Sequence, residues 1–453
     1  MTYFKKTFIW IIVLVAIGGY TMLDFKSTKI AEQKKEEQTR LLPFTADQVL
    51  ALTIKKESGT IELERWEKGW KIVSPLNAMA KNETVEKFIH EVTESRNDSE
   101  YVMDPNPTPE RLTEFGLAVP SITLTLKVGK ELKEHTILFG ARAPMMGIAY
   151  AQLEGLKPVY RVNADCRAEA DKDAYYFRDK SVLKLNPVMV DQVAVNWEGS
   201  PMLFKLSESG MWRIEKPVNA RMDQKKLFDF MGAFANSEVK EFISEKKEKL
   251  AAYGLDKPSA VIKFWISGDS NPTVQIDIGK RSPEKRGYFC AMSDRDAIFI
   301  LEEKAVNSIP RSADEMRSKQ LFFFEGEKLK RIELRSAAKS VVLVKDPENE
   351  WRKGDVLGAK VDFAMVNDFI EETKKFEIKE FVSGDLRDVR QYGLEPAGIQ
   401  AQMWLEDSAA PITLNLGKAT PAGYVYAFST AEKSILTLEE RAKRVLETFL
   451  KDL

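Results

Sequence analysis

Helical spacing of apolar residues recurs at three evenly spaced places along this chain. Each place holds a mostly apolar stripe at positions i, i+3, i+4 and i+7, which predicts one face of an amphipathic helix. The stripes are Val85, Phe88, Ile89 and Val92; Leu227, Phe230, Met231 and Phe234; and Val366, Phe369, Ile370 and Thr373. Around them apolar and polar residues alternate, as in TLTLKV and VQIDIG, which predicts half-buried antiparallel strands. The pattern therefore predicts an α+β fold in which helices cover one face of each sheet.

A tryptophan precedes each stripe at a constant distance. Trp70, Trp212 and Trp351 occur in GWKI, MWRI and EWRK, and each lies 15 residues before the first residue of its stripe. This fixed separation predicts that each indole packs between its sheet and its helix. The expected order in each repeat is three strands, the amphipathic helix, a short strand, a short capped helix, four strands and a closing helix.

Two sets of glycines repeat with the tryptophans. The first set follows an aromatic residue and precedes leucine, in FGL and YGL: Gly116, Gly254 and Gly393. With apolar residues on both sides and a proline just beyond, these glycines are predicted to end helices in Schellman motifs with positive φ. The second set closes the apolar runs ILFG, IDIG and LNLG: Gly140, Gly279 and Gly417. Residues 278–282 (IGKRS) lack the first glycine of a phosphate-binding loop, so we interpret them as a strand end.

The repeats set the domain boundaries. The segments YYFRDKSVLKL and EMRSKQLFFF are alike, and their arginines, Arg178 and Arg317, are 139 residues apart. No Pro- or Ser-rich linker separates the copies. The predicted organisation is a cytoplasmic tail (1–6), a transmembrane anchor (7–23), a charged stalk (24–43), module 1 (44–180), module 2 (181–318) and module 3 (319–453).

Residues 7–23, TFIWIIVLVAIGGYTML, carry no charge and predict one membrane span. The alternative is a cleaved signal peptide, but the exit GGYTML offers no clean small-x-small cleavage site. Lys5 and Lys6 precede the span, so the positive-inside rule keeps them in the cytoplasm. The expected location is therefore the cytoplasmic membrane, with lipid around residues 7–23 and everything after residue 23 on the extracytoplasmic (periplasmic) side.

Composition narrows the function by exclusion. Hydrophobic residues make up 44% and charged residues 30%, which is typical of globular proteins, and the net charge of −1 gives no reason to expect nucleic acid as a partner. Cys166 and Cys290 are too few for a disulfide scaffold or a CxxC zinc site, and are expected to be small buried residues.

The search for catalytic chemistry finds no constellation. His90 and His135 are far apart and have no counterparts in the other repeats, and His90 is expected at the solvent edge of its helix. The acidic residues Asp165, Glu169, Asp171 and Asp173 are interpreted as a solvated helix face. We therefore predict no catalytic, cofactor-binding or metal site.

The anchor followed by repeated tryptophan-to-YGL segments resembles the bacterial family known as domain of unknown function 4340. The resemblance covers the chain after residue 43 and rests on the tryptophans, the (F/Y)GL segments and the LGK-like turns. It implies an accessory role beside ABC-type transport proteins similar to gliding-motility export systems. The leading hypothesis is a non-enzymatic, membrane-anchored accessory or scaffold protein. A carbohydrate- or cell-wall-binding protein would instead need exposed aromatic residues in a groove, and a hydrolase two close carboxylates in a pocket.

Overall fold

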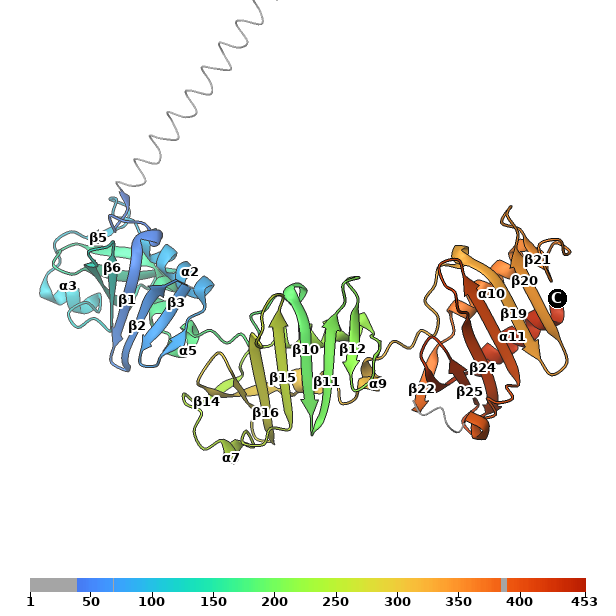
Figure 1. Cartoon of the computed structure of the whole chain (residues 1–453). Helices are drawn as coiled ribbons and strands as arrows, with labels where there is room; N and C mark the ends of the chain where they lie inside the picture. The colour runs from blue at the N-terminus through green and yellow to red at the C-terminus, as the bar shows by residue number, and fades with distance from the viewer. Residues whose placement is uncertain (1–38, 68, 384–388) are drawn as a thin grey trace, which may run out of the picture. The chain divides into compact units, whose positions relative to one another are not determined.

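In a computed structural model, which describes residues 39–67, 69–383 and 389–453, three antiparallel sheets are each covered by helices (Figure 1). The chain divides into two compact units, Met1–Lys180 and Ser181–Leu453. The first unit contains the sheet of module 1, and the second contains the sheets of modules 2 and 3. The predicted α+β fold is thus confirmed for the described residues.

Module 1 has a nine-stranded sheet whose order is β4-β3-β2-β1-β6-β7-β8-β9-β5. Its strands are β1 (Val49–Lys56), β2 (Gly59–Trp66), β3 (Gly69–Ser74), β4 (Ala78–Met79), β5 (Val102–Asp104), β6 (Ile122–Val128), β7 (Lys133–Arg142), β8 (Ile148–Leu153) and β9 (Val159–Asn163). Its helices are η1 (Ala46–Gln48), α2 (Asn82–Thr93), α3 (Pro109–Glu114), α4 (Ala164–Ala170) and α5 (Ala174–Phe177). Leu41 and Leu42, which belong to the predicted stalk, are buried in this core.

Module 2 repeats this sheet in the order β13-β12-β11-β10-β15-β16-β17-β18-β14. Its strands are β10 (Val190–Trp197), β11 (Ser200–Leu206), β12 (Trp212–Lys216), β13 (Ala220–Arg221), β14 (Glu241–Ser244), β15 (Ala260–Ile266), β16 (Val274–Ser282), β17 (Gly287–Met292) and β18 (Ile298–Glu302). Its helices are η2 (Pro187–Met189), α6 (Gln224–Ala235), α7 (Leu250–Tyr253), α8 (Glu303–Asn307) and α9 (Ala313–Met316).

Module 3 has eight strands in the order β21-β20-β19-β23-β24-β25-β26-β22 and a longer closing helix. Its strands are β19 (Leu329–Ser336), β20 (Ser340–Lys345), β21 (Trp351–Lys353), β22 (Ile378–Ser383), β23 (Ile399–Leu405), β24 (Ile412–Ala419), β25 (Tyr424–Ser429) and β26 (Ser434–Glu439). Its helices are η3 (Gly326–Lys328), α10 (Phe363–Lys374), η4 (Val389–Tyr392) and α11 (Glu440–Asp452). Helix α11 occupies the place that two short helices take in modules 1 and 2.

The amphipathic helix of each module connects the two opposite edges of its sheet, because it lies between β4 and β5, β13 and β14, or β21 and β22. Every residue of the three predicted stripes is buried, on α2, α6 and α10. Each module therefore has one large core between the sheet and this helix.

The first set of glycines ends helices as predicted. Gly116, Gly254 and Gly393 have φ of 67°, 69° and 69°. The leucine after each glycine donates its N–H to the carbonyl five residues back, over 2.8, 3.0 and 3.2 Å, which is the long hydrogen bond of a Schellman motif. In module 3 the helix concerned is the 3₁₀ turn η4.

Residues 278–282 form the end of strand β16, as predicted, and the second set of glycines lies inside strands. Gly140, Gly279 and Gly417 belong to β7, β16 and β24, and the strand register shifts at each of them. A Cβ atom would lie 2.1, 2.3 or 2.2 Å from the carbonyl oxygen of Phe115, Tyr253 or Tyr392. Glycine is required there because the helix end of the first glycine set presses against the strand.

Among the described ranges, no helix is long and apolar enough to cross a membrane. The predicted anchor, residues 7–23, and most of the predicted stalk lie outside the described residues.

Candidate functional site

The repeated tryptophans lie in the cores, with exposed fractions of 0% for Trp70, 3% for Trp212 and 1% for Trp351. The first residue of the following helix holds the strand in modules 1 and 2. Asn82 Oδ1 accepts from the Trp70 backbone N–H at 2.7 Å, and Gln224 Oε1 accepts from that of Trp212 at 2.9 Å. These hydrogen bonds explain the constant spacing from tryptophan to helix. Because the indole rings are buried, neither face of a ring is open to a ligand.

The acidic stretch of module 1 is only partly a solvated helix face. Asp165, Asp171 and Asp173 are exposed, but Glu169 is buried, which corrects the sequence interpretation. Helix α4 packs beside α2, and this places Glu169 Oε1 3.1 Å from the ammonium of Lys87.

Lys87 also lies 3.3 Å from Glu91, so one lysine serves two carboxylates. Its hydrogen bonds to Glu169 and then Glu91 raise the pKa of the ammonium. With the lysine between them, the carboxylates form an ion-pair network rather than an acid–base pair. Within the residues that the structure describes, no group of His, Cys, Asp or Glu could hold a metal ion.

The cysteines and histidines are not arranged for catalysis in the described part of the chain. Cys166 and Cys290 are free, buried thiols, and burial raises the pKa of Cys166 to about 12. A thiol with a raised pKa is a poor nucleophile at neutral pH. His135 packs against Phe44 with ring centroids 4.8 Å apart, and burial lowers its pKa, while His90 is exposed on α2 as expected.

A buried ionic cluster joins modules 2 and 3. The side chain of Glu432, in the turn between β25 and β26, is 2% exposed. It accepts from Arg221 Nε at 3.0 Å and from Arg317 Nη2 at 3.2 Å. Arg317 also donates to Ser434 Oγ at 3.3 Å, and its guanidinium lies 3.4 Å from the ring centre of Phe381. Two arginines of module 2 are thus paired with one carboxylate of module 3, and both modules belong to the same compact unit.

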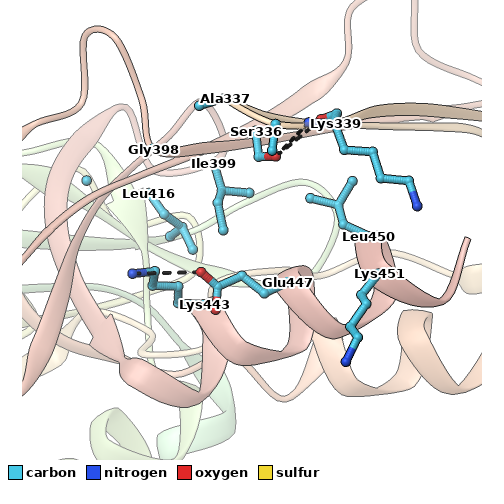
Figure 2. A pocket seen from close by; sticks show the side chains of 12 residues that line it. Ser336, Ala337, Lys339, Gly398, Ile399, Leu416, Lys443, Glu447, Leu450 and Lys451 are labelled. Carbon is cyan, nitrogen blue, oxygen red and sulfur yellow. Dashed lines mark hydrogen bonds and ion pairs between the residues drawn. The ribbon is translucent and has the colours of Figure 1, made fainter.

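A cavity of about 410 Å³ lies between α11 and the ends of β19 and β23 in module 3. Figure 2 shows the apolar side chains of Ile399, Leu416 and Leu450 between the helix and the strands, and the Lys443–Glu447 ion pair on α11. Lys339 and Lys451 add two further ammonium groups to the lining. The lining contains no histidine or cysteine and one carboxylate, Glu447.

A larger groove of about 840 Å³ is lined by residues of α10 and α11. The rings of Phe369 and Phe449 stack at its floor with centroids 3.9 Å apart, and Met365 and Val445 add apolar surface. Both of its sides are charged. The α10 side carries Asp362, Asp368 and Glu372, and the α11 side carries Arg441, Arg444 and Asp452, with Arg441 paired to Glu372. An apolar floor between charged rims is a suitable seat for a partner helix.

Sequence reasoning missed these module 3 surfaces because it expected only a closing helix in each repeat. The helical spacing of apolar residues in α11 could have indicated these surfaces. Its Ala442, Leu446, Phe449 and Leu450 form one buried face.

Comparison with known proteins gives one family and no functional relative. The family described as Domain of unknown function (DUF4340) matches residues 70–211 and 212–395, and the two matched segments begin at Trp70 and Trp212. No curated protein and no solved structure matches the chain.

Proposed function

The chain belongs to the DUF4340 family, and from that premise we propose that it is a non-enzymatic, membrane-anchored accessory or scaffold protein on the extracytoplasmic side, working with an ABC-type transport complex. Residues 7–23 would hold it in the cytoplasmic membrane, with residues 1–6 in the cytoplasm. The three modules would present a binding surface to the membrane complex.

One observation carries this proposal: the repeated residues stabilise the modules, whereas the groove between α10 and α11 is formed by a helix that only module 3 has in full length. The repeated tryptophans are buried, and both glycine sets serve the backbone. The groove combines a partly exposed apolar floor with charged rims. Such a surface is typical of protein–protein recognition.

The residues that the sequence singles out do not support the two alternatives. A carbohydrate-binding protein depends on exposed aromatic residues in a groove, but the repeated tryptophans are all in the cores. A hydrolase needs two carboxylates free to exchange a proton, but Glu91 and Glu169 share Lys87.

The test is capture of the full-length chain from membranes in a mild detergent, followed by identification of the bound proteins. We expect subunits of an ABC-type transporter. Val445→Glu, which places a charge on the floor of the groove, should release them. The control is Lys225→Glu on α6, a position whose side chain is 82% exposed and far from the groove in sequence.

Capture of no transporter subunit, or equal capture by both variants, would contradict the proposal. Topology has a separate test: a reporter that is active only outside the cytoplasm, fused after Leu453, should be active. Activity of a cytoplasmic reporter at that position would remove the extracytoplasmic assignment.

A further inference from the structure

In module 1 the segment that leaves the module pairs back onto the edge of its own sheet. After α5, the N–H of Asp179 donates to the carbonyl of Met79 at 2.9 Å, and the N–H of Lys81 donates to the carbonyl of Phe177 at 2.7 Å. The two segments form an antiparallel bridge centred on Ala80. This short added strand closes the edge next to β4.

Module 2 is closed in the same way and in the same register. The N–H of Ser318 donates to the carbonyl of Arg221 at 2.9 Å, and the N–H of Asp223 donates to the carbonyl of Met316 at 2.9 Å. The bridge is centred on Met222, which lies ten residues after Trp212, as Ala80 lies ten residues after Trp70. In both modules, therefore, the extended outgoing segment forms two backbone hydrogen bonds with the edge of the sheet.

The equivalent edge of module 3 is residues 360–362, which we call the module 3 edge. Val361 lies ten residues after Trp351, as Ala80 and Met222 lie after their tryptophans. Two hydrogen bonds attach this segment to β21: the Val361 N–H donates to the Trp351 carbonyl at 2.8 Å, and the Lys353 N–H donates to the Ala359 carbonyl at 3.0 Å. Backbone groups alternate in direction along an extended strand. The carbonyl of Lys360 and the N–H of Asp362 therefore point away from β21, where their counterparts in modules 1 and 2 are bonded.

No described residue occupies this position in module 3, because the segment after β26 is helical. Helix α11 runs from Glu440 to Asp452, and its Phe449 packs on Phe369 as Phe177 packs near Phe88 in module 1. The helix fills the core position of the outgoing segment but forms no bridge with the sheet edge. The backbone groups of the module 3 edge remain open to a ligand within the described structure.

The surroundings of the module 3 edge are apolar and exposed. Val356 is 47% exposed, Leu357 is 91% exposed and Phe363 is 58% exposed. Proteins normally protect open sheet edges with charge or cover, and an apolar open edge marks a place where another chain adds a strand. Lys360 and Asp362 supply the only charges of the edge itself, and Lys360 is paired with Glu350.

We propose that the module 3 edge binds an extended segment of a partner protein as an added antiparallel strand. The segment takes the register that residues 177–179 and 316–318 take in modules 1 and 2. Its backbone donates to the Lys360 carbonyl and accepts from the Asp362 N–H, and its apolar side chains cover Val356, Leu357 and Phe363. This inference deepens the scaffold function proposed above by naming the kind of partner segment that one surface takes.

The test uses the purified full-length chain in detergent and a fluorescent peptide, AYYARDKSVLKL. It has the sequence of residues 174–185 with alanine in place of Phe177, because Phe449 already fills the core position of that ring in module 3. Asp362→Pro removes the N–H at a residue whose φ of −61° already suits proline. Asp362→Ala loses the same side-chain cap of α10 but keeps the N–H, so it reports the cost of the lost cap alone. We expect saturable binding by the natural chain, and binding to Asp362→Pro weaker than to Asp362→Ala by about tenfold or more.

A second arm leaves the protein unchanged and alters the peptide. N-methylation at the position of Asp179 should abolish binding, and N-methylation at Lys180, whose N–H faces away in this register, should not. Absence of binding, or equal effects of the two N-methyl groups, would overturn the proposal. So would sedimentation showing that the chain dimerises and that Asp362→Pro dissolves the dimer, because the occupant would then be a second copy. The peptide assay involves no transporter, so its failure is distinct from failure of the membrane capture.

Discussion

Replacing Trp212 with alanine tests whether the repeated tryptophans hold each module together. The indole is 3% exposed and belongs to the core of module 2. A buried aromatic side chain removes about 150–250 Å² from water. At about 25 cal/mol per Å² this corresponds to about 4–6 kcal/mol, and truncations of this kind cost about 3–5 kcal/mol. The two hydrogen bonds between the Gln224 side chain and the Trp212 backbone stay in place in this variant. The loss of stability therefore comes from the indole side chain alone.

The two cysteines provide a local measurement of this loss. Cys290 is 0% exposed in the core that contains Trp212, and Cys166 is 1% exposed in the core of module 1. A buried thiol reacts only when its module opens, so a loss of about 4 kcal/mol raises its labelling rate by up to about a thousandfold. We expect Trp212→Ala to accelerate labelling of Cys290 and to leave Cys166 unchanged, as read by mass spectrometry of the labelled chain.

Two control variants make the result specific. Trp70→Ala should reverse the pattern, because Trp70 shares its core with Cys166. Trp66→Ala should change neither rate appreciably, because Trp66 is 50% exposed. If Trp212→Ala left the labelling of Cys290 unchanged, the core assignment and the estimate above would both be refuted.

Three further predictions follow from single positions. Gly279→Ala should lower the unfolding temperature by several degrees, since its Cβ would lie 2.3 Å from the carbonyl oxygen of Tyr253, and an unchanged melting curve would contradict this close approach. Arg352 and two backbone N–H groups hold the pKa of Asp346 below its usual range, so its stabilisation is present above the ordinary aspartate pKa of about 4 and is lost as the pH falls through the lowered value. Asp346→Asn should therefore lose less stability than the natural chain between pH 7 and pH 3, and equal melting shifts would disprove the link. Glu432→Ala should cost about 3–5 kcal/mol in denaturant unfolding, because it leaves the buried Arg317 and the half-buried Arg221 without their carboxylate, and a cost below 1 kcal/mol would show that they find other partners.

The repeat could be predicted from the sequence because its landmarks have unique backbone or volume requirements. A glycine at positive φ, as at Gly116 and its counterparts, leaves a mark that no other residue replaces cheaply. The register shifts at Gly140 and Gly279 could not be predicted from the sequence. A bulge of that kind depends on the neighbouring strand, which local sequence does not contain.

The burial of charged residues also could not be predicted from the sequence. Glu169 reads as part of an exposed acidic helix, and Glu432 lies in a polar hairpin turn. Both are buried by segments distant in sequence: Glu169 by α2, and Glu432 by the arginines of module 2. The module 3 edge was equally hidden, since a bridge centred on one residue, such as Ala80, leaves no periodic pattern.

The outgoing segments have a consequence for the order of events during synthesis. In module 1 the residue that closes the edge, Asp179, follows its partner Met79 by about 100 residues, so it leaves the ribosome about 5–20 s later at ordinary elongation rates. During that interval the nascent module has a nearly complete sheet with one unprotected side. The same interval recurs in module 2, so the growing polypeptide passes through two periods in which it is open to wrong pairing and to chaperone capture. Slowing translation just before codons 178 and 317 would lengthen these periods and raise the aggregated fraction of the newly made protein.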